Sequence, residues 1–182
     1  AKKDNDKTEL QESEEKPPQE PIADLAADMN ESLGSELIDL IMERDPAFFE
    51  KVVVELLERM GYGKGEVTSY TNDGGIDGLI TTDALGFRPI YTQAKRYVPD
   101  NKIGRPTIQS FVGALLDQRD GVFITTSSFT DEAIKYAHSY PGKTIILIDG
   151  RRLADLMIKY GLGVAVEGAI EIKRIDSDYF GD

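Results

Sequence analysis

The sequence predicts an α/β domain in which a mixed central sheet carries helices on both faces. Residues 66–96 contain three short runs of strand character separated by turn residues, which indicates antiparallel pairing. From residue 105 onward, helical spacing alternates with short apolar runs, an order typical of parallel strands joined by right-handed crossovers. The expected order is therefore helix, three strands, helix, strand, helix, strand, helix. At 40% apolar residues, a chain of 182 residues can bury a sizeable core.

The two ends of the chain differ in charge from its centre. The net charge is −12, but residues 1–45 contain 5 basic and 14 acidic residues, and residues 164–182 contain 2 and 5. The remaining 118 residues contain 14 of each sign. The neutral centre has no obvious basic stripe, which argues against tight DNA binding by this part alone. Residues 1–21, charged and interrupted by proline, are expected to form a disordered acidic linker.

Two helices are expected before the sheet. Residues 22–44 have helical spacing, with Ser35 as a candidate cap, and should pack beside the main domain as a helical extension. Asp45 followed by Pro46 is a favourable start for the next helix, because an aspartate caps free N–H groups and proline suits the first helical position. The apolar stripe of that helix consists of Phe49, Val52, Val53, Leu56, Leu57 and Met60.

Glu50 is the acidic residue at the edge of this stripe. At about 100° per residue it lies roughly 100° from Phe49, whereas the other charged residues of the helix fall on the outer face. A carboxylate beside an apolar surface is costly unless something satisfies it. A glutamate in the first turn is also favoured by the helix dipole, so the spacing leaves a functional and a structural role open.

A β-hairpin is expected next, after a strand at residues 66–70 and a glycine-rich turn at residues 71–75. The hairpin is GGIDGLITTDALGFRPIYTQAKR, residues 74–96, with its turn at DALGFR. Alternation in its second strand places Tyr91, Gln93, Lys95 and Tyr97 on one face and Ile90, Thr92 and Ala94 on the other.

Asp77, Gln93 and Lys95 are candidate catalytic residues, because the hairpin brings a carboxylate, an amide oxygen and an ammonium together. The oxygens of Asp77 and Gln93 suit Mg²⁺, with Mn²⁺ as a substitute. Such an ion acidifies a bound water and offsets charge on a phosphate, and Lys95 can orient the water or stabilise the same charge. These groups suit phosphodiester cleavage. An ordinary half-exposed sheet face explains the same pattern, and spacing alone does not decide.

The second half of the chain is expected to alternate helices with buried strands. The elements are a helix opening at Pro106, a strand at 121–125, a helix capped by Ser128 or Thr130, a strand at 144–148 and a helix at 151–160. Residues 164–175 alternate in their last part and are expected to add a final edge strand.

Four further residues are candidate contacts to DNA. Gly75 lies in a turn whose backbone N–H groups can meet a phosphate, and Ser127 follows a strand at the end where open α/β sheets bind ligands. Arg105 ends a polar loop, and Gln109 lies near the start of a helix. Each also has a structural explanation, as a plain turn, a helix cap or a solvated side chain.

Several classes of protein are excluded by composition. The chain contains no cysteine, which rules out disulfides and thiolate metal sites and is compatible with a reducing cytoplasm. A single histidine, His138, argues against a histidine-rich zinc site or a Ser-His-Asp triad. No apolar run is long enough to cross a membrane, and the first residues lack the apolar core of a signal peptide.

Six blocks of the sequence resemble, in order, the Mrr restriction endonuclease family. They are PAFFEKVVVELLERMGYG, GGIDGLI, YTQAKRY, GRPTIQSFVGAL, GVFITTSSFTDEA and IILIDGRRLADLMI. Asp77 followed by Gln93-Ala94-Lys95 resembles the D…QxK variant of the PD-(D/E)xK nuclease signature. The resemblance implies a restriction-endonuclease-like fold, with residues 46–164 as the nuclease domain, 22–45 as the helical extension and 165–182 as a C-terminal strand or tail.

The resemblance also implies an activity and partners. It implies Mg²⁺-dependent cleavage of double-stranded, chiefly methylated, DNA in the cytoplasm, with Asp77 and Gln93 as metal ligands, Lys95 positioning the water and Glu50 completing the site. It implies a winged-helix DNA-binding domain before the linker, and double-strand cleavage implies a homo-oligomer with two active sites. Gln93 stands where most of the wider superfamily has glutamate, which removes a charge near the metal. The competing hypotheses are a non-catalytic DNA-binding or assembly module with this fold, and a junction-resolving or repair nuclease.

Overall fold

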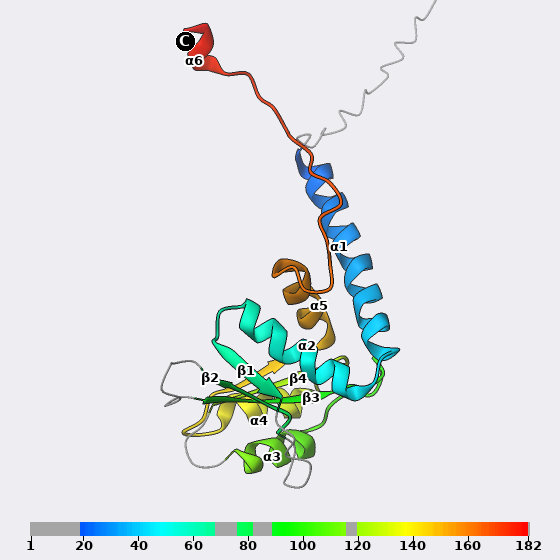
Figure 1. Cartoon of the computed structure of the whole chain (residues 1–182), viewed down its shortest axis with the longest axis vertical. Coiled ribbons are helices and arrows are strands. Elements are labelled where there is room, and N and C mark those ends of the chain that lie inside the picture. Colours follow the sequence, from blue (N-terminus) through cyan, green and yellow to red (C-terminus); the bar gives the residue numbers. More distant parts are fainter. Residues whose placement is uncertain (1–18, 68–75, 82–88, 116–119, 182) are drawn as a thin grey trace, which may run out of the picture.

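A five-stranded mixed sheet in the order β1-β2-β3-β4-β5 forms the centre of the molecule (Figure 1). The computed structural model describes residues 19–67, 76–81, 89–115 and 120–181. The strands are β1 (Lys64–Val67), β2 (Gly78–Thr81), β3 (Pro89–Lys95), β4 (Asp120–Thr125) and β5 (Ile145–Ile148). The predicted mixed sheet is confirmed.

The sheet changes from antiparallel to parallel at β3. β1 pairs antiparallel with β2, and β2 with β3, where Gly78 lies opposite Thr92. β3 and β4 are parallel, with Lys95 opposite Thr125, and β4 and β5 are parallel as well. The predicted hairpin and parallel second half are both confirmed. The first strand begins at Lys64, two residues earlier than predicted, and the predicted turns at 71–75 and DALGFR lie outside the described residues.

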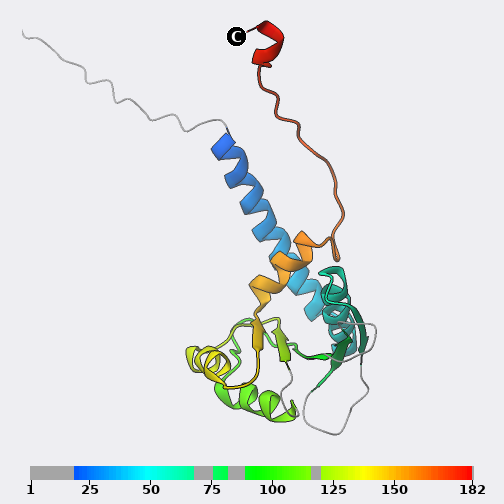
Figure 2. The same cartoon turned by 90° about the vertical axis from the view of Figure 1, so that its left-hand side faces the viewer.

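Helices cover both faces of the sheet (Figure 2). One face packs against α1 (Gln19–Met42), α2 (Pro46–Arg59) and α5 (Gly150–Lys159), and the other against α3 (Arg105–Ala114) and α4 (Asp131–Ser139). Each face has its own apolar core. None of the described helices is long and apolar enough to cross a membrane.

α2, α4 and α5 begin at or within one residue of where their capping residues predict, whereas the candidate cap Ser35 lies inside α1 and donates its hydroxyl to the Glu31 carbonyl at 3.1 Å. The Asp45 carboxylate accepts the Phe48 N–H at 2.7 Å, so that α2 starts at Pro46 as predicted. Thr130, rather than Ser128, caps α4. Asp149 caps α5, which starts one residue before the predicted range, and α3 likewise starts at Arg105, one residue before Pro106. Each side-chain cap satisfies an N–H group that has no partner within its own helix.

The alternation predicted for β3 is also confirmed. Ile90 and Ala94 pack into the core that α2 covers, whereas Tyr91 packs into the core that α3 and α4 cover. Gln93, two residues from Tyr91, therefore belongs to the opposite side of the strand from Ala94. This register determines which side chains the hairpin presents together.

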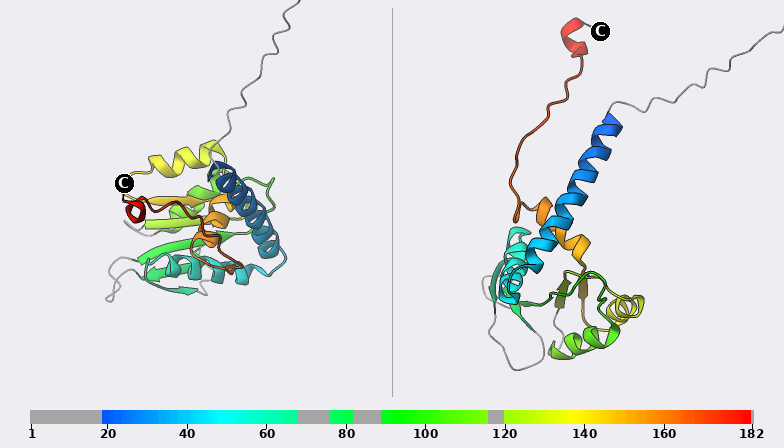
Figure 3. Two further views of the ribbon diagram at one scale, coloured as in Figure 1. Left: turned by 90° about the horizontal axis from the view of Figure 1, so that it is seen from above. Right: turned by 90° about the vertical axis from the view of Figure 1, so that its right-hand side faces the viewer.

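The predicted edge strand at residues 164–175 is wrong. These residues have no regular structure, and only a short helix, α6 (Ser177–Phe180), follows them. Alternating side chains show that a segment could bury one side, but a strand forms only where a sheet edge supplies hydrogen bonds. In this structure the segment leaves the body beyond α5, on the side where α1 also projects, and reaches neither edge of the sheet (Figure 3).

Candidate active site

Three elements bring the predicted catalytic residues to one region: the first turns of α2, the entry to β2 and the end of β3. Glu50 is half-buried on α2, immediately after Phe49, which is 1% exposed and anchors the helix to the sheet. The cap at Asp45 fixes the start of the same helix. Packing and capping together therefore hold the Glu50 backbone in place.

Asp77 is attached to β3 through both its main chain and its side chain. Its N–H donates to the Thr92 carbonyl at 2.8 Å, and its Oδ2 accepts the Ala94 N–H at 2.8 Å. The two bonds lie on either side of Gln93 along the strand. Asp77 is thus held beside Gln93, and one carboxylate oxygen is occupied by the bond to Ala94.

The side-chain amide of Gln93 is buried and lacks hydrogen-bond partners among the described residues. The residue is 4% exposed, and among the described residues its side chain has no hydrogen-bond partner. A buried amide without partners costs free energy, and in most proteins a water, an ion or a ligand satisfies such a group. This side chain is therefore the polar group at this site whose burial most needs an explanation.

Lys95 is the last residue of β3, and two threonine hydroxyls form hydrogen bonds with the main chain of Lys95 and of Tyr97, which follows it. Thr125 is fully buried, and its Oγ1 donates to the Lys95 carbonyl at 2.7 Å and accepts the Ser127 N–H at 3.1 Å. Thr126 Oγ1 accepts the Tyr97 N–H at 2.9 Å and donates to the Tyr97 carbonyl at 2.7 Å. These bonds extend the pairing of β3 with β4 beyond the strand and fix the Lys95 backbone.

The charges of Asp77, Asp45 and Lys95 act on Glu50. Burial raises the pKa of Glu50 above its ordinary value, and the negative charges of Asp77 and Asp45 raise it further, while the Lys95 ammonium lowers it. An interaction of this kind requires that the groups be close. The predicted residues of α2, β2 and β3 are therefore brought together.

The donor set suits a hard divalent cation. Among the described residues no three His, Cys, Asp or Glu side chains are grouped to hold a metal, so carboxylates alone do not make the site. Glu50 and Asp77 supply two carboxylates, and the Gln93 amide, which has no side-chain partner among the described residues, supplies a third oxygen. Mg²⁺ takes one or two carboxylates and keeps several waters, so this set fits it. A cation would also relieve the repulsion that raises the pKa of Glu50.

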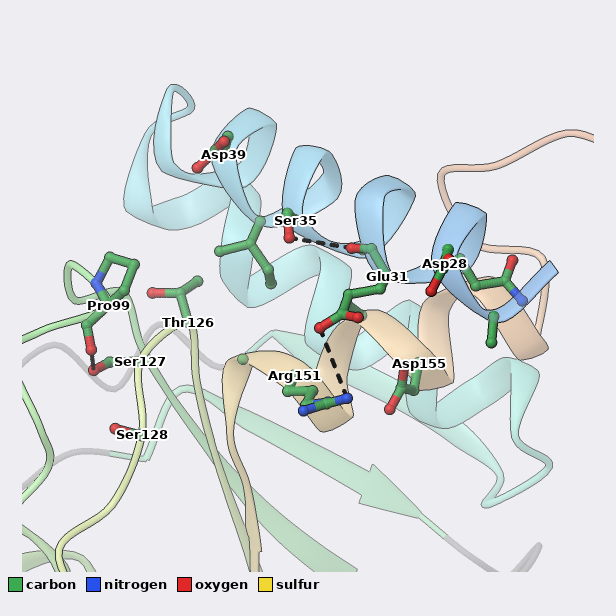
Figure 4. Close-up of a pocket in the computed structure, with 16 residues that line it drawn as sticks. Asp28, Glu31, Ser35, Asp39, Pro99, Thr126, Ser127, Ser128, Arg151 and Asp155 are labelled. Atoms are coloured by element: carbon green, nitrogen blue, oxygen red, sulfur yellow. Dashed lines mark hydrogen bonds and ion pairs between the residues drawn. The ribbon is translucent and has the colours of Figure 1, made fainter. Parts of the chain in front are cut away.

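The candidate DNA contacts do not gather around these residues. Ser127 is 5% exposed, and its hydroxyl lies 3.0 Å from the Pro99 carbonyl and 2.8 Å from that of Asn101 (Figure 4). Bonds within the protein explain it, and it is not part of the site proposed below. Arg105 and Gln109 are exposed on α3, with Arg105 5.1 Å from the centre of the Tyr136 ring. Gly75 lies outside the described residues.

A cavity of about 650 Å³ lies near Ser127, between α1, the residues that follow β4 and the start of α5 (Figure 4). Asp28, Glu31, Asp39 and Asp155 line it, together with Arg151. None of the four predicted catalytic residues borders this cavity.

Sequence reasoning missed Asp45 and Thr125 as parts of the site. The sequence predicts Asp45 as a cap, but its effect on the pKa of Glu50 depends on how the start of α2 lies against the sheet. The sequence predicts Thr125 at the end of a strand, and only the register of β3 with β4 sets it opposite Lys95. The signal in the sequence for a residue that supports a neighbouring strand, as Thr125 does, is a hydroxyl at the end of a buried strand.

Comparison with known proteins identifies the relatives of this chain. A family model of the Mrr catalytic domain, described as a restriction endonuclease, matches residues 41–157. The chain is 40% identical over 159 residues to the type IV methyl-directed restriction enzyme EcoKMrr of Escherichia coli (strain K12). The match covers 84% of this chain and 51% of that protein, so the chain spans about half the length of this relative.

Solved structures share the fold. The DNA modification-dependent restriction endonuclease AspBHI superposes with a TM-score of 0.60 at 21% identity, over 71% of this chain and 36% of that one. The MspJI restriction endonuclease, in complex with a 27-mer oligonucleotide, gives 0.54 at 23% identity, over 70% of this chain and 31% of that one. At these identities the likeness concerns the fold.

Proposed function

The chain belongs to the Mrr restriction endonuclease family, and from this we propose that it hydrolyses DNA phosphodiester bonds with Mg²⁺ at Glu50, Asp77, Gln93 and Lys95. The proposal is supported chiefly by the two hydrogen bonds that attach Asp77 to β3 on both sides of Gln93. It is supported further by Glu50, whose pKa responds to the charges of Asp77 and Lys95. Two carboxylates, an amide oxygen and an ammonium converge there.

Asp77 and Gln93 would hold the ion through a carboxylate and an amide oxygen, with Glu50 as a further oxygen donor to the ion or to its water. A bound Mg²⁺ supplies an acidified water and offsets negative charge on the phosphate. Because glutamine is neutral, Gln93 gives the site one negative charge fewer than a glutamate would. Since the Gln93 amide is buried and otherwise unpartnered, binding through its oxygen would also satisfy it.

Lys95 and Glu50 would handle the attacking water. The Lys95 ammonium donates a hydrogen bond that orients the water, or it stabilises charge that develops on the phosphate. Glu50, whose charge interacts with those of Asp77 and Lys95, would be placed to take a proton from that water. Thr125 would act on the reaction only through the Lys95 backbone.

The substrate proposal is methylated double-stranded DNA, on the strength of the relative named as methyl-directed. Nothing in the described residues recognises a methyl group, so we assign that recognition to a winged-helix DNA-binding domain elsewhere in the protein. The charge balance of residues 46–163, with 14 basic and 14 acidic residues, favours this division of labour, because a neutral domain binds DNA weakly alone. Restriction of incoming DNA is an activity of the cytoplasm, and we propose that compartment for the protein.

Plasmid cleavage tests the proposal. Supercoiled plasmid, methylated and unmethylated, is incubated with the chain in Mg²⁺, in Mn²⁺ or in EDTA. The variants are Asp77→Ala and, as a matched control on the exposed side of α5, Asp155→Ala. We expect metal-dependent cutting that Asp77→Ala loses by at least 100-fold and Asp155→Ala keeps, with the two plasmids cut equally by this chain alone and the methylated plasmid preferred once a DNA-binding domain is present.

The outcomes separate the parts of the proposal. Metal-dependent cutting that survives Asp77→Ala would refute the assigned site, and a preference of this chain alone for methylated plasmid would refute the assignment of methyl recognition to another domain. If the chain alone does not cut, the assay is repeated with a DNA-binding domain fused to it. If the fusion also fails to cleave either plasmid, the nuclease proposal is refuted and a non-catalytic module is favoured.

A further inference from the structure

α1 carries an apolar stripe that no described part of the chain covers. Ile22, Leu25, Met29 and Leu33 are spaced three or four residues apart and therefore lie on one side of the helix. They are between 37% and 65% exposed. Leu37 and Ile41 continue the same row in steps of four and are buried against α5 and the body, so the row becomes exposed where α1 projects beyond them. These four exposed side chains are called the α1 stripe below.

Residues 164–180, called the C-terminal segment below, expose apolar side chains in a strand-like pattern. Val166, Ile170 and Ile172 share one side of an extended chain, and they are 91%, 85% and 58% exposed. Tyr179 and Phe180 beyond them are 82% and 71% exposed. Alternation of this kind is typical of a strand with one buried face, yet within the described chain the segment pairs with no strand.

The two features project from the same side of the molecule. Figure 3 shows the first half of α1 and the C-terminal segment extending away from the sheet in the same direction. Between them they hold more than half of the large apolar side chains that are exposed in the described residues. Soluble proteins rarely leave so much apolar surface together, and such surfaces usually mark an interface.

We propose that the partner is a second copy of this chain, with the C-terminal segments of the two copies paired antiparallel and laid over both α1 stripes. A strand needs a neighbour for its backbone, and an identical segment related by a twofold axis supplies one. In a pair that crosses at Ile172, Glu171 of each copy lies opposite the partner's Lys173. The segment is therefore self-complementary in charge as well as in backbone.

Charge also selects between the ways in which two copies can meet. Residues 19–42 contain six acidic residues and no basic residue, so that two α1 helices in direct contact would set acid against acid. Residues 164–180 contain four acidic residues as well as Lys173 and Arg174, but in a pair that crosses at Ile172 these two cations lie near the centre, with Glu167, Asp176 and Asp178 toward the ends. Placing the centre of the paired segments between the helices therefore separates the two acidic α1 helices and sets cations nearest to their acids. Resting on the proposed function, the same dimer would carry the two active sites that a double-strand break requires.

The oligomeric state of the chain, measured without DNA or metal, tests the interface. Sedimentation equilibrium is run on the wild type, on Met29→Glu, on Ile170→Glu/Ile172→Glu, and on Ile134→Glu, an exposed apolar residue of α4 on the other face of the sheet. We expect a dimer whose dissociation constant rises at least tenfold in the first two variants and less than twofold in Ile134→Glu. A wild type that is monomeric at 100 µM overturns the proposal, as does a dimer that none of the variants weakens. Because neither DNA nor metal is present, failure here says nothing against the nuclease.

Disulfide cross-linking identifies which segment covers which helix. The chain has no cysteine, so Met29→Cys and Ile170→Cys each introduce a single thiol. Mixing the two single variants under mild oxidation should give a covalent dimer joined between positions 29 and 170. If the double variant instead forms only an intrachain link at low micromolar concentration, the segment covers its own α1 and the proposal is overturned. Circular dichroism of each variant confirms that it is folded.

Discussion

Thr125 offers a test of how the fold positions Lys95. Its hydroxyl donates to the Lys95 carbonyl at 2.7 Å and accepts the Ser127 N–H at 3.1 Å, and the side chain is fully buried. Thr125→Val keeps the shape of the side chain but removes both bonds. Thr125→Ser keeps both bonds and removes one methyl group. The pair of variants therefore separates the hydroxyl from the packing.

The cost of Thr125→Val follows from the two groups it leaves unpaired. A buried polar group that loses its partner costs about 1–3 kcal/mol, so two groups cost roughly 2–6 kcal/mol. For a domain of this size, about 2–4 °C of Tm accompanies each kcal/mol, which gives a fall of roughly 4–24 °C. Thr125→Ser loses one buried methyl group, about 1 kcal/mol, and a few degrees.

Activity should follow the same order. Thermal unfolding gives Tm, and single-turnover plasmid cleavage is then measured at a temperature where both variants are folded. We expect Thr125→Val to slow cleavage at least tenfold, since small displacements of catalytic groups are costly, and Thr125→Ser to stay within about threefold of the wild type. Equal rates in the two variants, or a Tm for Thr125→Val within 2 °C of the wild type, would refute the reasoning.

Three further predictions concern Glu50, Gly78 and Asp77. Burial and the charges of Asp77 and Asp45 raise the pKa of Glu50, so the folded chain binds a proton at this carboxylate more tightly than the unfolded chain does. The resulting stabilisation of the folded state is complete below the ordinary pKa of glutamate and is lost as pH rises through the raised pKa of the folded chain. Glu50→Gln should flatten the pH dependence of the free energy of unfolding, measured with urea between pH 4 and 8 without metal. An unchanged slope would contradict the raised pKa of Glu50. A Cβ on Gly78 would lie 2.5 Å from Thr92 Oγ1, so Gly78→Ala should destabilise the hairpin by about 1–3 kcal/mol in denaturant unfolding, and a neutral effect would show that the strands part easily. Saturating Mg²⁺ should raise the Tm of the wild type, since a ligand held at 100 times its Kd stabilises by about 2.7 kcal/mol, and an equal rise in Asp77→Ala would place the ion elsewhere.

Much of the fold could be predicted because it depends on local chemistry. The start of α2 at Pro46 follows from the capping aspartate before it, and the hairpin follows from alternation on both sides of a turn. The same alternation places Gln93 and Lys95 on one side of β3, and an antiparallel neighbour then brings Asp77 beside them. These inferences need only the periods of helices and strands.

The remaining features depend on contacts between distant segments. The bonds of Thr125 to Lys95 require the register of two parallel strands, which the crossover through α3 determines. The environment of Glu50 requires the orientation of α2 on the sheet. The expected edge strand at residues 164–175 failed because alternation cannot say whether a sheet edge is within reach.

The site also explains why a nuclease domain would tolerate an unfavourable arrangement. Glu50 lies near two other carboxylates and is partly removed from water, and Gln93 is buried without a partner in the described chain. Both features cost stability in the metal-free protein, and both are relieved if oxygen atoms here bind a cation. Such conflicts are expected at functional sites rather than in a structural core.

The central claim is that Asp77 and Lys95 belong to one catalytic centre, and a double-mutant cycle on single-turnover plasmid cleavage in Mg²⁺ tests it most directly. The rates of the wild type, Asp77→Ala, Lys95→Ala and the double variant are compared, with Lys159→Ala as the control for loss of an exposed lysine. If the two residues act together, each single variant loses at least 100-fold, the double variant loses little more, and Lys159→Ala keeps its rate. Near wild-type cleavage by either single variant would contradict the claim, and so would losses that multiply in the double variant.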